Sequence, residues 1–185
     1  MGRYRFAGIS LALLCSLLIL ISACGKISNT KNVESMSPDE LDIAMKEEMQ
    51  KTPPNEMSAE EKIAEIKIAS SISQGEILKR GKFEGRAHDS KGEIKIFQQD
   101  GESYLVLGED FKTDAGPDLH VVITEHPDPK NSMNLHEGEY ADLGPLKSTT
   151  GVQMYKIPKN NVGKFNTASI YCKPFKVIFG IAKLK

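Results

Sequence analysis

Large aromatic side chains are missing from one long stretch of this chain and frequent in the rest. No Phe, Tyr or Trp occurs between Cys24 and Lys82, whereas ten occur from Phe83 to the C-terminus. A packed core depends on such side chains, because each one buries a large apolar area. We therefore expect the core to begin near Phe83 and the residues before it to form an appendage.

The aromatic-rich part alternates apolar and polar residues over short runs. Residues 93–98 and 103–107 alternate in this way and are separated by Asp100-Gly101, a strong signal for a tight hairpin. Gly and Pro separate the other apolar runs. These further strand candidates are residues 77–83, 118–124, 153–157, 169–172 and 175–182. The pattern predicts an all-β domain over residues 76–185, a small antiparallel β-sandwich or barrel.

Residues 24–75 are expected to form a tether that carries two short amphipathic helices. Each predicted helix begins at a capping box, Ser37-Pro38-Asp39-Glu40 or Ser58-Ala59-Glu60-Glu61. Thin stripes of Met and Ile follow these boxes. We expect the stripes to pack on the β domain or on each other, with a partner protein as the alternative. The polar run 25–35, ahead of both helices, is expected to be disordered.

The N-terminus has the physical parts of a secretory signal. Two Arg residues precede an uncharged run, residues 6–23, that is rich in Leu and Ile. The run ends in Ile-Ser-Ala-Cys24, which resembles a bacterial lipobox. Residues 1–23 are therefore expected to be a lipoprotein signal peptide, with lipid on Cys24 after cleavage.

Lipid on Cys24 would attach the protein to a bacterial membrane. The expected location is extracytoplasmic, on the outer membrane if the cell is Gram-negative. Two alternatives stay open, which are an uncleaved anchor and ordinary signal-peptidase cleavage without lipid.

Cysteine usage limits the chemistry of the processed chain. Cys15 lies inside the leader, so Cys172 is the one free thiol expected after processing. No CxxC motif occurs, which excludes an internal disulfide and a cysteine zinc site. The formal net charge of −1 argues against a nucleic-acid partner. No P-loop, nucleophile elbow or dinucleotide glycine pattern occurs, so no motif supports an enzyme.

Several short blocks follow one another in order through the β part. They are Gly81-Lys82-Phe83, His88, Gly92, Phe111, Gly116-Pro117-Asp118-Leu119, Leu143-Gly144, Leu146-Lys147, Gly151, Gln153, Tyr155, Pro158, Ala168-Ser169-Ile170-Tyr171-Cys172 and Phe175–Ala182. This ordered set resembles the DM-thirteen family of small extracellular domains, which often occur beside DOMON domains and are proposed to transfer electrons. Tyr171 departs from the family, which often has Trp there.

The resemblance implies an all-β domain with one cysteine near its end, here Cys172, and a proposed redox role for it. The leading hypothesis is a membrane-anchored electron-transfer accessory domain centred on Cys172, as thiol or ligand. Its partner would be an envelope protein or a redox protein. A haem or a metal is compatible with the sequence but not required, so the cofactor stays open. Weaker binding candidates are His88, Asp118, His120 and Tyr171.

The alternative hypothesis is a non-catalytic envelope interaction or ligand-binding module. Ile170 and Cys172 fall on one face of a predicted strand, and Lys173 on the other. Free cysteine is among the most buried residue types, so Cys172 would be an inert core residue. Exposed loops such as 126–140 would then carry binding. The choice depends on the burial of the thiol, because only a thiolate is reactive.

Overall fold

The computed structural model describes residues 33–158 and 162–185, all within one unit of the chain, Lys31–Lys185. The predicted signal peptide and Cys24 lie outside the described residues. Of the run 25–35, only the last three residues are described, and they form a 3-10 helix, η1 (Val33–Ser35). Among the described helices, none is both long and apolar enough to cross a membrane.

Two helices begin at the capping boxes that the sequence indicates. They are α1 (Pro38–Lys51) and α2 (Ala59–Ile72). The hydroxyl of Ser37 accepts a hydrogen bond from the backbone N–H of Glu40 at 3.4 Å, and Glu61 donates likewise to Ser58 at 3.2 Å. Both predicted helices are confirmed. A short third helix, α3 (Ser132–Leu135), and a 3-10 turn, η2 (Val162–Lys164), were not predicted.

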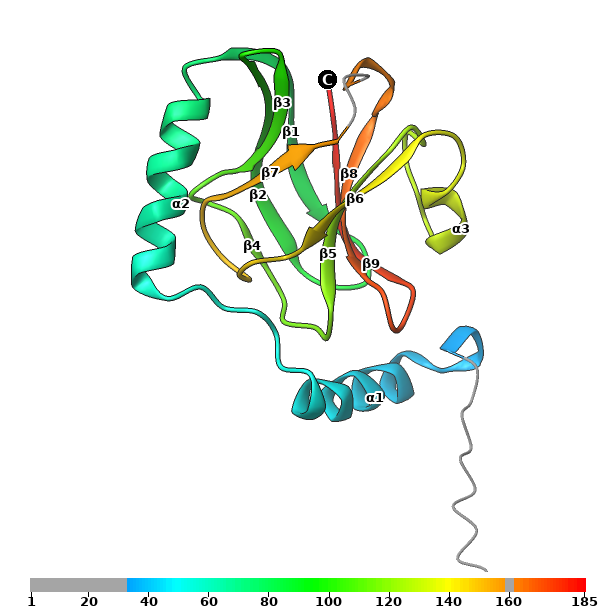
Figure 1. Ribbon diagram of the computed structural model, residues 1–185. Helices are drawn as coiled ribbons and strands as arrows, with labels where there is room; N and C mark the ends of the chain where they lie inside the picture. The colour runs from blue at the N-terminus through cyan, green and yellow to red at the C-terminus, as the bar shows by residue number, and fades with distance from the viewer. Residues whose placement is uncertain (1–32, 159–161) are drawn as a thin grey trace, which may run out of the picture. The chain divides into compact units, whose positions relative to one another are not determined.

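The rest of the described chain is dominated by antiparallel strands. They are β1 (Glu76–Gly85), β2 (Ser90–Gln99), β3 (Glu102–Leu107), β4 (Lys112–Thr113), β5 (Leu119–Thr124), β6 (Tyr140–Pro145), β7 (Gln153–Ile157), β8 (Thr167–Cys172) and β9 (Val177–Lys183). The order in the sheet is β6-β5-β8-β9-β1-β2-β3-β7, with β4 paired to β2. Figure 1 shows how this sheet curls around one interior.

The two ends of this order meet, so the sheet nearly closes on itself. Strands β6 and β7 contact each other. The Tyr155 hydroxyl, from β7, accepts a hydrogen bond from the backbone N–H of Lys147 at 3.0 Å and lies 3.4 Å from the Pro145 carbonyl. The all-β prediction, a small antiparallel sandwich or barrel, is confirmed.

Strands β5 and β8 are buried on both faces. Their inner residues, such as Val121 and Ile170, belong to the main core. On the outer face, Leu135 of α3 packs with Val122 and Tyr171 in a second apolar cluster. This cover explains why every residue of both strands is buried although each strand alternates between two faces.

Both N-terminal helices pack on the β domain, as expected for their apolar stripes. Met45 of α1 belongs to the main core, and Ala69 of α2 packs with Phe97 and Val106. The core therefore also uses residues before Phe83, contrary to the expectation from aromatic content. The proposed domain boundary at residue 76 stays a prediction.

Polar contacts fix α2 and the segment before it to the domain. Glu65 accepts hydrogen bonds from the Met154 backbone N–H at 2.9 Å and from the Lys147 ammonium. Glu56 accepts from the hydroxyls of Ser148 at 2.7 Å and Thr149 at 2.6 Å. Each carboxylate thus meets donors far away in the sequence, and such charge-assisted bonds are stronger than neutral ones.

Candidate functional site

Cys172 ends β8 and points into the barrel. Ile170 and Cys172 share the core face of the strand, as predicted, and both are fully buried. The strand register pairs Cys172 with Leu119 on one side and Val177 on the other. The thiol therefore lies at one end of the barrel, beneath the residues that lead into β5.

The surroundings of the Cys172 thiol favour its protonated form. The Cys172 Sγ–H donates a hydrogen bond to the carbonyl oxygen of Pro117 at 3.2 Å. Burial raises the pKa of the thiol to about 11. The backbone N–H of Phe175 opposes this shift, and the nearby charge of Asp118 adds to it. Because the thiolate is the reactive form, Cys172 is shielded and unreactive in this arrangement.

The turn Gly116–Asp118, called the covering turn below, covers the thiol and restricts which residues can occupy it. A Cβ at Gly116 would lie 2.5 Å from the Phe179 ring, so only glycine fits there. Asp118 adopts a φ of +47°, in the left-handed region that non-glycine residues seldom occupy. Its carbonyl accepts a hydrogen bond from the Lys173 backbone N–H at 3.3 Å, which ties the turn to the end of β8.

A charged cluster lies on the outer face beside this turn. The Nδ1 of His120 is 2.8 Å from an Asp142 carboxylate oxygen, and its Nε2 is 3.1 Å from one of Asp118. Both contacts can be hydrogen bonds only if both ring nitrogens carry hydrogen, which is the imidazolium form. The imidazole ring thus bridges the carboxylates of Asp118 and Asp142 in one compact cluster.

Asp142 is the centre of this cluster and was not predicted from the sequence. Partial burial would raise its pKa, but hydrogen bonds from His120 and from the Gly144 backbone N–H outweigh burial and lower it. The Lys173 ammonium also contacts the carboxylate, at 3.2 Å. Lys173 thus points away from Cys172, as expected, and pairs with a carboxylate instead of activating the thiol.

The side chains of the other two binding candidates, His88 and Tyr171, make their contacts with groups other than the thiol. The His88 ring stacks on Phe179 with centroids 3.9 Å apart, so Phe179 lies between His88 and the turn at Gly116. Tyr171 is paired with His120 across β5 and β8. Its hydroxyl lies 2.9 Å from that of Ser132, within the outer cluster. The structure therefore gathers Cys172, Asp118 and His120 at one barrel end, with Tyr171 and His88 around it.

One small cavity lies beside the turn that covers Cys172. The cavity beside the covering turn has a volume of about 50 Å³ and is lined by residues 52–55, Gly116, Asp118, Leu119, Leu146 and Thr149. Small-molecule pockets usually measure about 300–1,000 Å³. Within the described residues, no three His, Cys, Asp or Glu side chains are arranged to hold a metal. In this arrangement Cys172 can act as a shielded thiol.

Comparison with known proteins adds one match. A family model described as "Electron transfer DM13" matches residues 82–184, more than half of the chain. No curated protein and no solved structure matches the chain. The match contains the covering turn, the charged cluster, all strands after β1 and Cys172.

Proposed function

The chain belongs to the DM13 family of electron-transfer domains, and from this premise we propose that it is a redox accessory protein held on the outer side of a bacterial membrane. The family match over residues 82–184 is the observation that carries the electron-transfer part. The remaining parts of the proposal are the lipid anchor at Cys24 and the use of Cys172.

The N-terminal sequence supports the anchor. The uncharged run 6–23 and the small residues before Cys24 suit cleavage and acylation at that cysteine. More than one acyl chain is needed for stable anchoring, and a lipidated N-terminal cysteine supplies this. The nine residues from Cys24 to the first described residue, Val33, span at most about 30 Å. The domain would therefore work close to the membrane surface.

We place the redox role at Cys172, the free cysteine of the described residues. Its supporting feature is the covering turn, which makes access to the thiol depend on a local movement. When the Gly116–Asp118 turn lifts, water reaches the sulfur and the thiol pKa falls toward its ordinary value of 9.0. The closed turn then protects the thiol from adventitious oxidation outside the cytoplasm.

A single cysteine can exchange with a disulfide of its partner protein. The thiolate of Cys172 attacks one sulfur, the partner's S–S bond breaks, and a mixed disulfide forms. The electron pair of the broken bond leaves on the partner's second sulfur, which takes up the proton released by Cys172. The partner supplies the only other redox group, so the step is balanced.

A specific observation also favours the alternative of an interaction module. Cys172 is fully buried and its thiol pKa is raised, as for a core residue with no chemistry. In that case the loop between β5 and β6 would carry binding. Its most exposed apolar side chain is Met133, three-quarters of which is exposed.

The redox role and the interaction module can be distinguished by how a reagent reaches the thiol, through local opening or through global unfolding. The processed, lipidated chain, in which Cys172 is the expected free thiol, is treated in detergent micelles with a small aromatic disulfide reagent. The labelling rate is compared with the global unfolding rate. If the turn opens locally, labelling exceeds unfolding by at least about tenfold and changes little with dilute urea. If Cys172 is inert core, both rates agree and respond to urea alike.

A second cysteine on the same strand provides the matched control. Ile170→Cys in the Cys172→Ala background places a thiol on the same face of β8, two residues further from the turn and equally buried. This thiol is expected to react only through global unfolding. Equal labelling rates for the two positions would refute local opening at the turn and leave the interaction module.

A further inference from the structure

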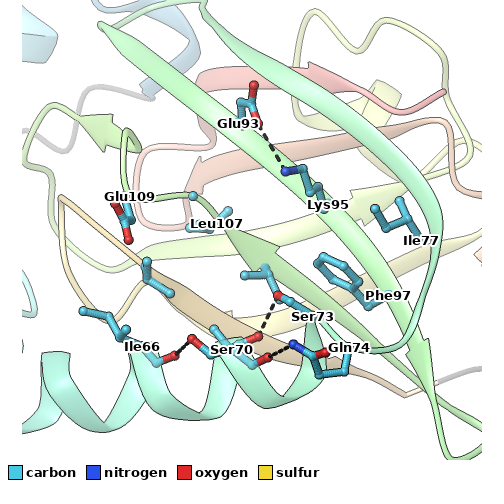
Figure 2. Close-up of a pocket in the computed structure, with 14 residues that line it drawn as sticks. Ile66, Ser70, Ser73, Gln74, Ile77, Glu93, Lys95, Phe97, Leu107 and Glu109 are labelled. Carbon is cyan, nitrogen blue, oxygen red and sulfur yellow. Dashed lines mark hydrogen bonds and ion pairs between the residues drawn. The ribbon is translucent and has the colours of Figure 1, made fainter.

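One groove lies between α2 and the outer face of β2 and β3. Its volume is about 530 Å³, and Figure 2 shows α2 along one side with β2 opposite. Ile66 and Ile77 line it with 44% and 40% of their surface exposed, beside Phe97. Exposed apolar side chains that share a groove mark a contact surface more often than scattered ones do.

A second groove crosses the outer face of β1, β2 and β9, with a volume of about 690 Å³. Its charged lining comprises Arg80, Lys82, Lys95, Lys183 and Lys185 with Glu84 and Glu93. Lys95 lies 3.4 Å from Glu93, and Lys183 lies 3.6 Å from Asp128. Within the described part of the chain, the side chains of the other three cations form no ion pair. The groove therefore carries excess positive charge.

The two grooves form one surface because they share residues of β2. Glu93 and Lys95 line both, and Figure 2 shows this ion pair at the border of the first groove. The register places Arg80 opposite Lys95 and Lys82 opposite Glu93. An apolar half thus adjoins a basic half, and we call the pair the β2 surface. Apolar contacts with charged surroundings are the usual make-up of a protein interface.

The basic half of the β2 surface reaches the end of the barrel opposite to that where the segment after α1 packs. That segment lines a cavity with Gly116 and Leu119. Leu119 pairs with Cys172, at one end of the sheet, whereas Lys183 pairs with Thr167 at the other. Arg80 and Lys185 exchange backbone hydrogen bonds at that second end. The position and the hollow shape favour a protruding polypeptide over a flat lipid surface.

We propose that the β2 surface docks an acidic polypeptide segment, with apolar side chains among its carboxylates, on the protein that exchanges electrons with this chain. The inference rests on the proposed function, which requires such a partner. Uncompensated positive charge attracts carboxylates from a distance and speeds encounter. Redox encounters of this kind use small interfaces.

The test uses a labelled peptide as the probe. The full chain in detergent micelles is titrated with a fluorescent twelve-residue peptide of alternating Glu and Leu, and with a second peptide in which Gln replaces Glu. We expect the Glu peptide to bind at least about tenfold more tightly at low salt and to lose most of that advantage at 0.3 M salt. Equal affinity of the two peptides, or no binding, would overturn the proposal.

Matched variants locate the binding on the molecule. Lys82→Glu and Arg80→Glu are expected to weaken binding about tenfold, while Lys112→Glu makes the same charge change at an exposed site outside both grooves. Ile66→Ser is expected to weaken binding several-fold, whereas Ile43→Ser, exposed on α1, leaves it unchanged. Equal losses in the groove variants and their controls would show non-specific attraction and refute docking.

Two further measurements distinguish docking of a polypeptide from lipid binding and from the proposed function of Cys172. Vesicles with 30% anionic phospholipid should bind wild type and Lys82→Glu equally, and a selective loss in Lys82→Glu together with no peptide binding would assign the surface to lipid. Cys172→Ala should bind the peptide as wild type does, because the thiol lies in neither groove. A negative result in the thiol-labelling test therefore does not refute docking at the β2 surface. A negative result in the peptide test likewise does not refute the redox role of Cys172.

Discussion

The thiol of Cys172, at the end of β8, donates its hydrogen to the carbonyl oxygen of Pro117, 55 residues earlier in the chain. This bond ties the covering turn to the interior of the barrel. It exists only while the sulfur is protonated, because a thiolate has no hydrogen to donate. The closed turn and the protonated thiol therefore stabilise each other.

Alkaline pH should weaken the folded protein through this thiol. Its folded pKa of about 11 lies above the ordinary value of 9.0, so folding stabilises the protonated form. This contribution is fully present below pH 9 and is lost as the pH rises toward 11. At about 1.4 kcal/mol per pKa unit, the loss reaches about 3 kcal/mol. Urea midpoints at pH 8 and pH 10.5 should fall more for wild type than for Cys172→Ala, and parallel declines would contradict this.

Removing the ring of His120 should destabilise the fold, because the carboxylates of Asp118 and Asp142 then lose the side chain that bridges them. We expect His120→Ala to lower the free energy of unfolding by about 1–3 kcal/mol. His136→Ala, which changes an exposed histidine between β5 and β6, should cost less. Adding Asp142→Asn to His120→Ala should recover part of the loss. A double variant less stable than His120→Ala would show that charge is not the cause.

Asp142 should also contribute to acid sensitivity. Its folded pKa is lowered, mainly because hydrogen bonds from His120 and the Gly144 N–H outweigh the effect of burial. The stabilisation is present above the ordinary carboxyl pKa and is lost as the pH falls through the lowered value. Between pH 6 and pH 3, wild type should therefore lose more stability than Asp142→Asn in urea unfolding. An equal loss in both proteins would argue against this role.

Glu65 should hold α2 against the domain. Glu65→Ala removes the acceptor for the Met154 N–H and the Lys147 ammonium, and we expect a loss of about 1–3 kcal/mol. Hydrogen exchange in α2 should become faster before that of the barrel does. Glu60→Ala, an exposed change on the same helix, is the control. Unchanged exchange in Glu65→Ala would show that apolar packing alone holds the helix.

Acylation at Cys24 can be tested without a structure of the leader. Cells fed an alkyne-tagged fatty acid should label wild type and Cys15→Ser but not Cys24→Ser. Cys15→Ser is the matched control, because it makes the same replacement inside the proposed leader. Label on Cys24→Ser, or none on wild type, would reject the lipid anchor.

Local signals in the sequence predicted much of the fold. The Asp100-Gly101 hairpin is confirmed, with both residues at positive φ, as the tight turn between β2 and β3 requires. The run 153–157 coincides with β7. Strand β6 was missed, because Gly144-Pro145 indicates a turn and the strand forms only where β5 pairs with it.

The candidate site was predictable only where its residues lie on one strand. Strand alternation correctly placed Ile170 and Cys172 on the core face. Asp142 reaches His120 only because β6 lies beside β5, which no local pattern indicates. His88 stacks on Phe179, which lies near the other end of the matched region, and Phe179 in turn lies beside the covering turn. The order of the strands in the sheet, a long-range property, therefore determines which residues come into contact around the thiol.

The bond from Met154 to Glu65 has a consequence for handling the protein. Strand β7 ends the sheet order, so its outward N–H groups could pair with a strand of another molecule. The Glu65 carboxylate of α2 already accepts a hydrogen bond from one of these donors, and the helix contacts β7. A truncated protein that starts at the family boundary would bare this edge. Such material should self-associate and precipitate on concentration, whereas chains that keep residues 55–72 should stay dispersed.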